Sequence, residues 1–574
     1  MKSFAALALA VLLAGCAAAQ SKEPRAASET APPAGPMFEP TEVRSAGSVT
    51  VDGVAIAYQA VAGTLIVHPK GWTDTLAAER RRDKDAGKDI PDAEASMFYT
   101  AYFKEGAPAE SRPITFFFNG GPGSPTLWLH MGAFGPVRVE TPDLVHGSAP
   151  YRIVANDQSL LGVSDLVFVD APGTGFSRVA GKDKADAFFG VDQDIHAFTV
   201  FIRDFLSKHG RWKSPKYLYG ESYGTMRAAG MTLALQRQDI DLNGVILLSD
   251  ILNWDLIPDD PQLNPGVDLP YIVSLPTYAA TAWYHKRAAG NPPELRPFLD
   301  EVEKFATTDY ALALMKGNGL PDDERQAIAA RLHAYTGLPL AYLLKTNLRI
   351  EYGAMQKELL ADKGQTTGTL DTRFTGPTLD PLSKTASYDP QGSAIGGAYT
   401  AAFNDYARRT LGYGEGRHYE GSLGVYGSWD YKHEPPEAGR PLIALPNVLP
   451  DLAAAMKQNP QMKLLVTGGY FDVSTPYFAG WYELQHLPVP KELQANIAYK
   501  YYPAGHMVYV NVPLLREMRV DVADFIRRTD NIDCTARRSS HRAEAPSCVP
   551  TRPRRSSPSS SPARGSQPIR LWTC

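Results

Sequence analysis

A serine, an aspartate and a histidine that could together carry out nucleophilic catalysis occur in that order along this chain. Ser222 is the centre of Gly220-Glu221-Ser222-Tyr223-Gly224. This pattern is typical of a nucleophile elbow, a strand-to-helix turn so tight that the flanking positions tolerate little but glycine. A serine nucleophile needs a base to accept its proton, and the base needs a carboxylate to orient it. The order serine, acid, histidine predicts Asp472 as the orienting acid and His506 as the base.

The acid and the base each follow an apolar run that indicates a buried strand. Residues 463–467 lead through two glycines to Asp472, and residues 497–502 lead to His506, in the loop after the last expected strand. Asp250 is the rival acid because it also ends an apolar run; as a structural residue it would cap the segment that follows. We favour Asp472 over Asp250.

A glycine-rich loop follows an earlier apolar run, where residues 114–118 lead into Asn119-Gly120-Gly121-Pro122-Gly123. Hydrolysis through an acyl-enzyme needs two backbone N–H groups that converge on the developing oxyanion. Tyr223, directly after the nucleophile, would supply one. The loop could supply the other, because glycine lets the backbone approach a substrate without a Cβ atom in the way. The alternatives are a plain tight turn and, less favoured because no Lys-Ser/Thr pair follows, a phosphate-binding loop.

The elements that must position these residues alternate between short apolar runs and helical spacing. Apolar residues recur at helical spacing between 191 and 205, and another helix is expected over 225–236. Strands that alternate with helices predict a mostly parallel sheet. Buried strands are expected at 114–118, 166–169, 216–219 and 245–248, antiparallel strands or hairpins at 49–68 and 97–103, and a solvated loop at 79–88.

The pattern changes between about 253 and 460. This stretch is rich in Pro, Gly and Tyr and shows no sheet pattern; helix-like pieces occur at 293–305, 322–335 and 398–411. The strand pattern returns at 463–467 and 497–502, and 514–526 is expected to form a closing helix. We therefore expect an α/β fold whose mostly parallel central sheet, from residues 37–252 and 461–530, is interrupted by a large helical insertion at 253–460.

Four motifs in this order resemble those of the serine carboxypeptidases. They are Phe118-Asn119-Gly120-Gly121-Pro122-Gly123-Ser124, Val169-Asp170-Ala171-Pro172-Gly173-Thr174-Gly175-Phe176-Ser177, Gly220-Glu221-Ser222-Tyr223-Gly224-Thr225 and Gly505-His506-Met507. The resemblance covers roughly residues 97–526. It implies an α/β-hydrolase fold with a helical cap insertion over the active site, and the C-termini of peptides or proteins as substrates.

The resemblance also implies roles for individual residues. Ser222 would be the nucleophile, Asp472 the orienting acid and His506 the base, with the backbone N–H groups of Gly121 and Tyr223 in the oxyanion hole and Asn119 and Glu221 hydrogen-bonded to the terminal carboxylate of the substrate. A protonated Glu221 could share its proton with that carboxylate, which favours acidic pH because two bare carboxylates repel each other.

Two positions depart from the family. Fourteen residues beyond Asn119, where the family has a second carboxylic acid, this chain has Ala133, which weakens the expected carboxylate clamp and the case for an acidic optimum. Ser124 stands where the family has a cysteine. The leading hypothesis is thus a serine-type carboxypeptidase. An esterase or acyltransferase on the same scaffold is the alternative, and a catalytically inactive binding lipoprotein is a third, less favoured hypothesis.

The two ends differ from the rest of the 574 residues. An apolar run at 4–14 reaches Leu13-Ala14-Gly15-Cys16, which resembles a bacterial lipobox and predicts lipidation of Cys16. The alternative is ordinary signal-peptidase cleavage after an alanine at 17–19. Residues 1–36 would then be signal peptide and tether of an exported, periplasmic or cell-envelope protein. The basic stretch 531–574 is expected to be disordered and without function.

Composition excludes several other classes. The net charge of −4 does not suggest a nucleic-acid partner. The four cysteines lie at position 16 and in the basic tail, so thiol catalysis and Cys-based zinc sites are not expected in the folded region. The chain has no HExxH motif, and neither a metal nor a cofactor is expected. Membrane contact is expected only through the lipid anchor.

Overall fold

The computed structural model describes residues 37–75, 77, 93–257, 264–441 and 445–532. The lipobox at Cys16, the tether, the loop expected at 79–88 and the basic tail from residue 533 lie outside the described residues. None of the described helices is both long and apolar enough to cross a bilayer.

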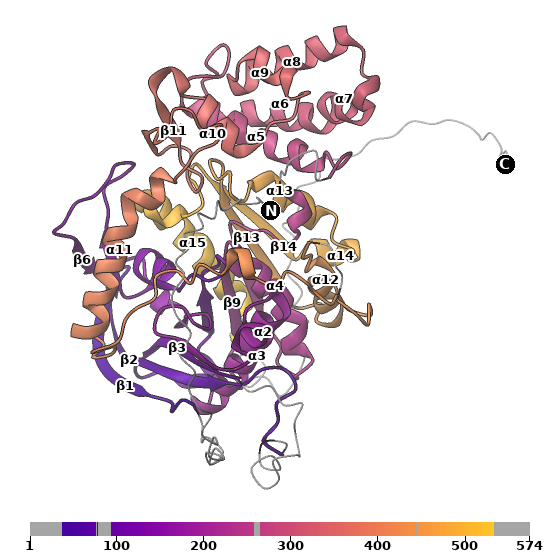
Figure 1. Ribbon diagram of the computed structural model, residues 1–574. Helices are drawn as coiled ribbons and strands as arrows, with labels where there is room; N and C mark the ends of the chain where they lie inside the picture. Colours follow the sequence, from indigo (N-terminus) through magenta and orange to yellow (C-terminus); the bar gives the residue numbers. More distant parts are fainter. Residues whose placement is uncertain (1–36, 76, 78–92, 258–263, 442–444, 533–574) are drawn as a thin grey trace, which may run out of the picture.

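One large sheet organises the molecule (Figure 1). Its strands follow the order β1-β2-β3-β7-β4-β9-β10-β13-β14, and β8 pairs with β3. In this order, the neighbouring strands from β7 through β4, β9, β10 and β13 to β14 pair in parallel. The pairs β1–β2, β2–β3, β3–β7 and β3–β8 are antiparallel. The bounds are β1 (Glu42–Val51), β2 (Val54–Val67), β3 (Ala93–Lys104), β4 (Ile114–Phe118), β7 (Asp165–Val169), β8 (Arg178–Gly181), β9 (Lys216–Glu221), β10 (Gly244–Leu248), β13 (Lys463–Gly469) and β14 (Ile497–Tyr502).

The strands expected from the sequence are confirmed, and the apolar side chains of β4, β7 and β10 explain why these three lie at the centre of the sheet. All five residues of β4, β7 and β10 are buried, as befits strands covered on both faces of a parallel sheet. Successive side chains enter different clusters: Phe116 and Phe118 pack on one face and Phe117 on the other. A second, small pair of strands is formed by β5 (Val137–Glu140) and β6 (Arg152–Ala155).

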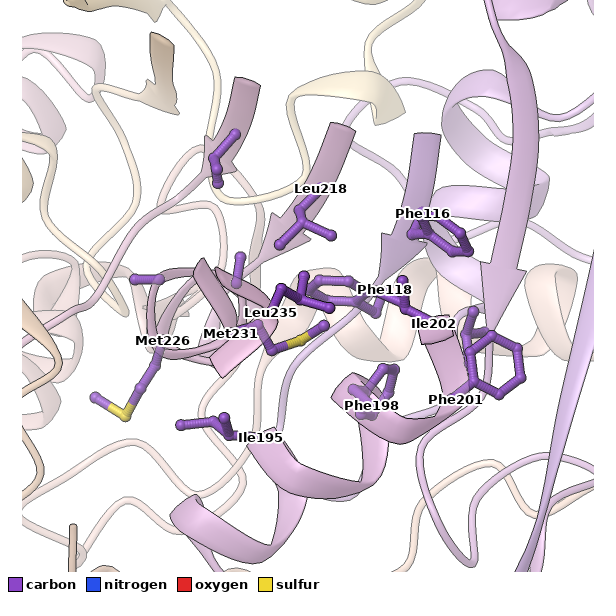
Figure 2. Close-up of a cluster of buried hydrophobic side chains, with 14 of the residues drawn as sticks. Phe116, Phe118, Ile195, Phe198, Phe201, Ile202, Leu218, Met226, Met231 and Leu235 are labelled. Atoms are coloured by element: carbon purple, nitrogen blue, oxygen red, sulfur yellow. The ribbon is translucent and has the colours of Figure 1, made fainter. Parts of the chain in front are cut away.

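Helices cover both faces of the sheet. On one face, α3 (Val191–Lys208), α4 (Tyr223–Gln236) and α12 (Leu449–Gln458) pack on the strands. Figure 2 shows side chains of β4 and β9 facing those of α3 and α4. The other face is covered by α11 (Pro390–Arg409), α15 (Val512–Thr529) and a π-helical turn at Leu129–Phe134. Short helices occur at α2 (Lys184–Phe188) and α14 (Lys491–Gln494).

Most of the inserted helices gather at one end of the molecule (Figure 1). They are α5 (Leu269–Tyr284), α6 (Leu295–Phe305), α7 (Ala311–Lys316), α8 (Asp322–Thr336), α9 (Leu340–Lys345) and α10 (Tyr352–Glu358). They share a third hydrophobic cluster with Phe471, Val473 and residues of α13 (Tyr477–Gln485), which belong to the strand-bearing part of the chain. The helices expected at 293–305 and 322–335 are α6 and α8, and the one expected at 398–411 lies largely in α11, which begins eight residues earlier.

The expectation that 253–460 contains no sheet is wrong. Strands β11 (Gln365–Thr367) and β12 (Thr375–Pro377) form a short antiparallel pair there. Strands of three residues are too short for a pattern of alternation to be seen in the sequence.

Candidate active site

Ser222 occupies a strained turn between β9 and α4. Its φ and ψ are 61° and −133°, a combination that non-glycine residues rarely adopt. A Cβ atom on Gly220 or on Gly224 would come within 3.0 Å of neighbouring backbone, so both flanking positions require glycine. The Ser222 N–H donates to the carbonyl of Leu248, the last residue of β10, at 3.0 Å. The serine therefore lies at the carboxyl end of the sheet, as the elbow pattern predicts.

His506 and Asp472 meet in the loops after β14 and β13. The His506 Nδ1–H donates to Asp472 Oδ2 at 2.8 Å, and both side chains are buried. Thr475 Oγ1 donates to the same oxygen at 2.7 Å, and the backbone N–H groups of Ser474 and Thr475 donate to Oδ1. Burial lowers the pKa of His506, but the charge and hydrogen bond of Asp472 outweigh this effect and leave that pKa above its ordinary value.

The serine and the histidine belong to the same edge of the sheet. Ser249, next to the Leu248 that binds the Ser222 N–H, donates its hydroxyl to the His506 carbonyl at 2.9 Å. Ser222 and Thr475, which contacts His506 Nδ1, line one cavity of about 120 Å³. Within the described part of the chain, Ser222 Oγ makes no hydrogen bond to His506. In substrate-free hydrolases such bonds are often long and shorten when substrate binds.

The glycine-rich loop lies against the start of α4. A Cβ atom on Gly120 would come within 3.0 Å of the Tyr223 nitrogen, so the loop approaches this closely only because the residue is glycine. Gly121 has a φ of 114°, and it lines the same cavity as Ser222 and Tyr223. The two residues expected to form the oxyanion hole thus border one cavity with the nucleophile.

A buried ion pair that was not predicted from the sequence holds this loop through a hydrogen bond to its first residue, Asn119. Arg227 on α4 pairs with Asp194 on α3, with 2.7 Å between Nε and Oδ2, and both side chains are fully buried. Arg227 Nη1 also donates to the Asn119 carbonyl at 2.7 Å. The only signal in the sequence is a lone charge in the apolar stretch that follows the elbow. Asp170, which belongs to the second motif but was assigned no role from the sequence, accepts from the Thr126 N–H at 2.8 Å.

Glu221 and Asn119 also lie together, and a tyrosine joins them. Tyr509 donates its hydroxyl to the Glu221 carboxyl group, with distances of 2.9 and 3.1 Å to the two oxygens. Burial raises the pKa of Glu221 to about 7, although His506, Tyr509 and Asn119 each act to lower it. Ala133 is fully buried in the hydrophobic cluster on the face of the sheet that α11 and α15 cover. Tyr509 follows His506 by three residues, and that proximity is the signal that could have identified it.

Asp250, the rival acid, is also buried. It packs against Gly480 of α13, where a Cβ atom would come within 3.0 Å of its carboxyl group. Burial raises the pKa of Asp250 above its ordinary value. In the described residues the imidazole of His506 makes its carboxylate hydrogen bond to Asp472. No group of three or more His, Cys, Asp or Glu in this part of the chain is arranged to hold a metal ion.

The sheet order, the serine at a strand-to-helix turn and the histidine and aspartate after later strands define the fold of an α/β hydrolase. Residues 89–248 match the family model described as serine carboxypeptidase. The matched segment, which contains the glycine-rich loop and Ser222, is therefore similar to the serine carboxypeptidases.

Curated relatives match over stretches of comparable length. The retinoid-inducible serine carboxypeptidase of Homo sapiens is 30% identical over 207 residues, which cover 33% of this chain and 41% of that protein. Serine carboxypeptidase-like 13 of Arabidopsis thaliana is 29% identical over 184 residues, 31% of this chain and 40% of that protein. The chain thus spans less than half the length of the curated relatives it matches. Among solved structures, the proline iminopeptidase of Mycobacterium smegmatis aligns with 85% of this chain and 99% of its own at 13% identity and a TM-score of 0.31.

Proposed function

We propose that this protein is a serine-type carboxypeptidase that hydrolyses the C-terminal peptide bond of peptides or proteins. The observation that carries the proposal is the placement of a buried, protonatable carboxyl group, Glu221, directly beside a serine in a strained elbow. An exopeptidase needs both a nucleophile and a group that recognises the free carboxylate of the last residue. The family match over residues 89–248 supports the same reaction class.

The reaction would proceed through an acyl-enzyme. His506 Nε2 accepts the Ser222 proton while Ser222 Oγ attacks the carbonyl carbon of the scissile bond, and Asp472 holds the imidazole through Nδ1. The backbone N–H groups of Gly121 and Tyr223 stabilise the oxyanion. His506 then gives the proton to the leaving amine, and water, activated by the same histidine, releases the shortened peptide.

Glu221 would act in substrate recognition. In its protonated form it donates to the terminal carboxylate, and Asn119 offers its amide. Tyr509 holds the Glu221 carboxyl group in place through its hydroxyl. This tyrosine provides a hydrogen-bonding partner in a chain whose Ala133 cannot serve as a second acid.

Digestion of peptides followed by mass spectrometry tests the proposal. The protein should shorten free-acid peptides from the C-terminus, and Ser222→Ala should lower kcat by about 10⁴-fold or more. Asp472→Asn should cost a comparable factor, about 10⁴, because the imidazole is left in the wrong tautomer. Asp250→Asn is the matched control and should retain most activity. Equal cleavage of amidated and free-acid peptides would contradict the exopeptidase proposal.

An esterase or acyltransferase is the second candidate. It is favoured by the absence of an acid at Ala133 and by the cavity at Ser222, whose lining residues do not include Glu221 or Asn119. Turnover of acyl esters or acyl transfer to an alcohol, without any turnover of peptides, would select this function. Ester cleavage alongside peptide cleavage would not, because an activated serine cleaves both.

We also propose that the protein is exported and anchored by a lipid on Cys16, on the strength of its lipobox-like sequence. The protein should then be recovered with membranes and label with radioactive palmitate. Cys16→Ala should abolish the label; labelling that survives this substitution would contradict the proposal.

A further inference from the structure

A short segment of the helical insertion crosses the two loops that carry Asp472 and His506. Residues 368–374, here called the strap, connect β11 with β12. Hydrogen bonds join the strap to these loops at three residues, Phe471, Pro503 and His506. The Leu370 carbonyl accepts from the His506 N–H at 2.6 Å, the Thr372 N–H donates to the Phe471 carbonyl at 2.9 Å, and Arg373 Nη1 donates to the Pro503 carbonyl at 2.7 Å.

An ion pair within the strap fixes the arginine. The guanidinium of Arg373 contacts both oxygens of Asp371, with Nη2 2.6 Å from Oδ2 and Nε 3.0 Å from Oδ1. The Arg373 side chain is 10% exposed and that of Asp371 is 2% exposed. The guanidinium also lies over the ring of Phe471. Asp371 itself presses on Gly505, where a Cβ atom would come within 3.0 Å of it.

Other hydrogen bonds join the strap to helices of the insertion. The Thr369 N–H donates to Asp389, the residue before α11, at 2.8 Å. The Thr372 side chain and carbonyl bind two residues at the end of α5, Thr281 and His285, each at 2.7 Å. The strap therefore connects helices of the insertion with the residues that immediately precede Asp472 and His506.

We propose that the strap positions the base and its orienting acid, and that Arg373 is the positioning residue on which this depends. Beyond β13 and β14, the loops at 470–475 and 503–507 are joined to each other by few backbone hydrogen bonds, such as the one from the Phe471 N–H to the Ala504 carbonyl at 2.9 Å. Bonds from the strap therefore add to those that fix the shape of both loops. The strap supplies such bonds at Phe471, Pro503 and His506. Misplacement of a catalytic group by about 1 Å can cost about 10²-fold in rate. This inference rests on the proposed roles of Ser222, His506 and Asp472 but not on the choice between peptide and ester as substrate.

Kinetics of Arg373→Met, with Arg349→Met as the matched control, test the inference. Arg349 lies in the same insertion and forms a similar two-point pair with Asp268, with 2.7 and 2.8 Å separations. Arg373→Met should lower kcat by 10- to 100-fold with KM changed less than about threefold. It should slow the labelling of Ser222 by a fluorophosphonate in parallel. Arg349→Met should leave kcat within about twofold. Arg373→Lys should be intermediate, because an ammonium cannot bind Asp371 at two points and reach Pro503 as well.

The inference is overturned if Arg373→Met and Arg349→Met have the same kcat, or if the loss falls on KM alone. If Arg373→Met does not fold, Asp371→Asn decides the question in the same assay, because it removes the charge that orients the guanidinium while leaving its hydrogen bond to Pro503 possible. A lowered kcat then supports the strap, and an unchanged kcat overturns it. An unmodified protein that neither turns over substrate nor labels with the fluorophosphonate contradicts the proposed function instead, so the two failures are distinguishable.

Discussion

Two arginines support different loops of the candidate site, and they differ in what surrounds them. Arg227 lies within the sheet-bearing core, fully buried with Asp194, and its guanidinium stacks on Phe198 at 4.2 Å. Arg373 lies in the insertion, is 10% exposed beside the nearly buried Asp371, and donates to a loop 130 residues away in sequence. Each donates to one carbonyl at the edge of the site, at Asn119 and at Pro503.

Because their surroundings differ, we expect loss of Arg227 to affect mainly the stability of the fold and loss of Arg373 to affect mainly catalysis. Removal of a fully buried cation leaves an uncompensated buried charge, which the whole fold must bear. Arg373 is 10% exposed, so after its removal water can reach Asp371 and replace part of the lost hydrogen bonds. The fold should then lose less than at Arg227, while the loop at Pro503 loses its fixed position. The first prediction below tests this separation directly. The other two concern Glu221, which is proposed to act in substrate recognition, and His433, which is expected to act on stability.

The largest effect on stability is expected for Arg227→Met. It should lower the free energy of unfolding by about 3–5 kcal/mol, because Asp194 is left buried without its partner. Arg373→Met should cost less, about 1–3 kcal/mol, because it leaves the Asp371 carboxylate without its partner at a site that water can partly reach. Urea denaturation followed by circular dichroism measures both. A loss at Arg227 no larger than that at Arg373 would remove the distinction between the two supports.

A clear effect on pH dependence is expected for Glu221→Gln. Burial raises the pKa of Glu221 to about 7, so its protonated form prevails below pH 7 and declines about tenfold per pH unit above it. With free-acid peptides, kcat/KM should therefore fall above pH 7. Glu221→Gln, whose amide donates at every pH, should abolish that fall.

Two comparisons control this prediction. An ester substrate without a terminal carboxylate should show no alkaline fall with either protein. At acidic pH the rate should decline for both proteins, because His506, whose pKa is raised, then carries a proton and cannot act as the base. An alkaline fall that persists in Glu221→Gln would show that another group controls it.

A smaller effect, confined to a window of pH, is expected for His433→Gln. His433 contacts Asp192 of α3 at 2.6 Å and Asp451 of α12 at 2.8 Å. It follows Tyr426, which lines the cavity at Ser222, by seven residues, so these contacts join that part of the chain to both helices. Burial lowers the pKa of His433, but the two aspartates outweigh it and raise that pKa to about 9. Because the folded-state pKa exceeds the ordinary 6.5, this stabilisation is complete below pH 6.5 and is lost as the pH rises through 9.

His433→Gln should therefore lower the free energy of unfolding by an amount on the order of 3 kcal/mol at pH 6. The difference from the unsubstituted protein should vanish above pH 9. Thermal denaturation at pH 6, 8 and 10 measures it. A difference that does not depend on pH would mean that His433 acts through packing and not through its charge.

The sequence predicted those parts of the molecule in which one local pattern determines the structure. Buried strands such as β4 and β10 are continuous apolar runs, and the elbow at Ser222 requires glycine on both sides, so each is visible within a few residues. The pairing of His506 with Asp472 followed from chain order and strand ends.

The parts that could not be predicted depend on contacts between distant segments. Nothing near Arg373 indicates that it reaches Pro503, and the three-residue strands on either side of the strap carry no periodicity. Tyr509 and Arg227 were visible as residue types, but their partners Glu221 and Asn119 are known only from the fold. The catalytic roles of Ser222, Asp472 and His506 stay predictions that the kinetics above test.

The shared hydrophobic cluster of the insertion limits how this protein can be re-engineered. Phe471 and Val473, on either side of Asp472, pack among the inserted helices and help to form their core. The insertion is therefore not an exchangeable module. A chimera that takes these helices from another hydrolase must also take the matching residues around its acid, or it will disturb the acid when it repacks. Local unfolding of the inserted helices would likewise disturb Asp472. The protein would then lose activity while its central sheet was still folded.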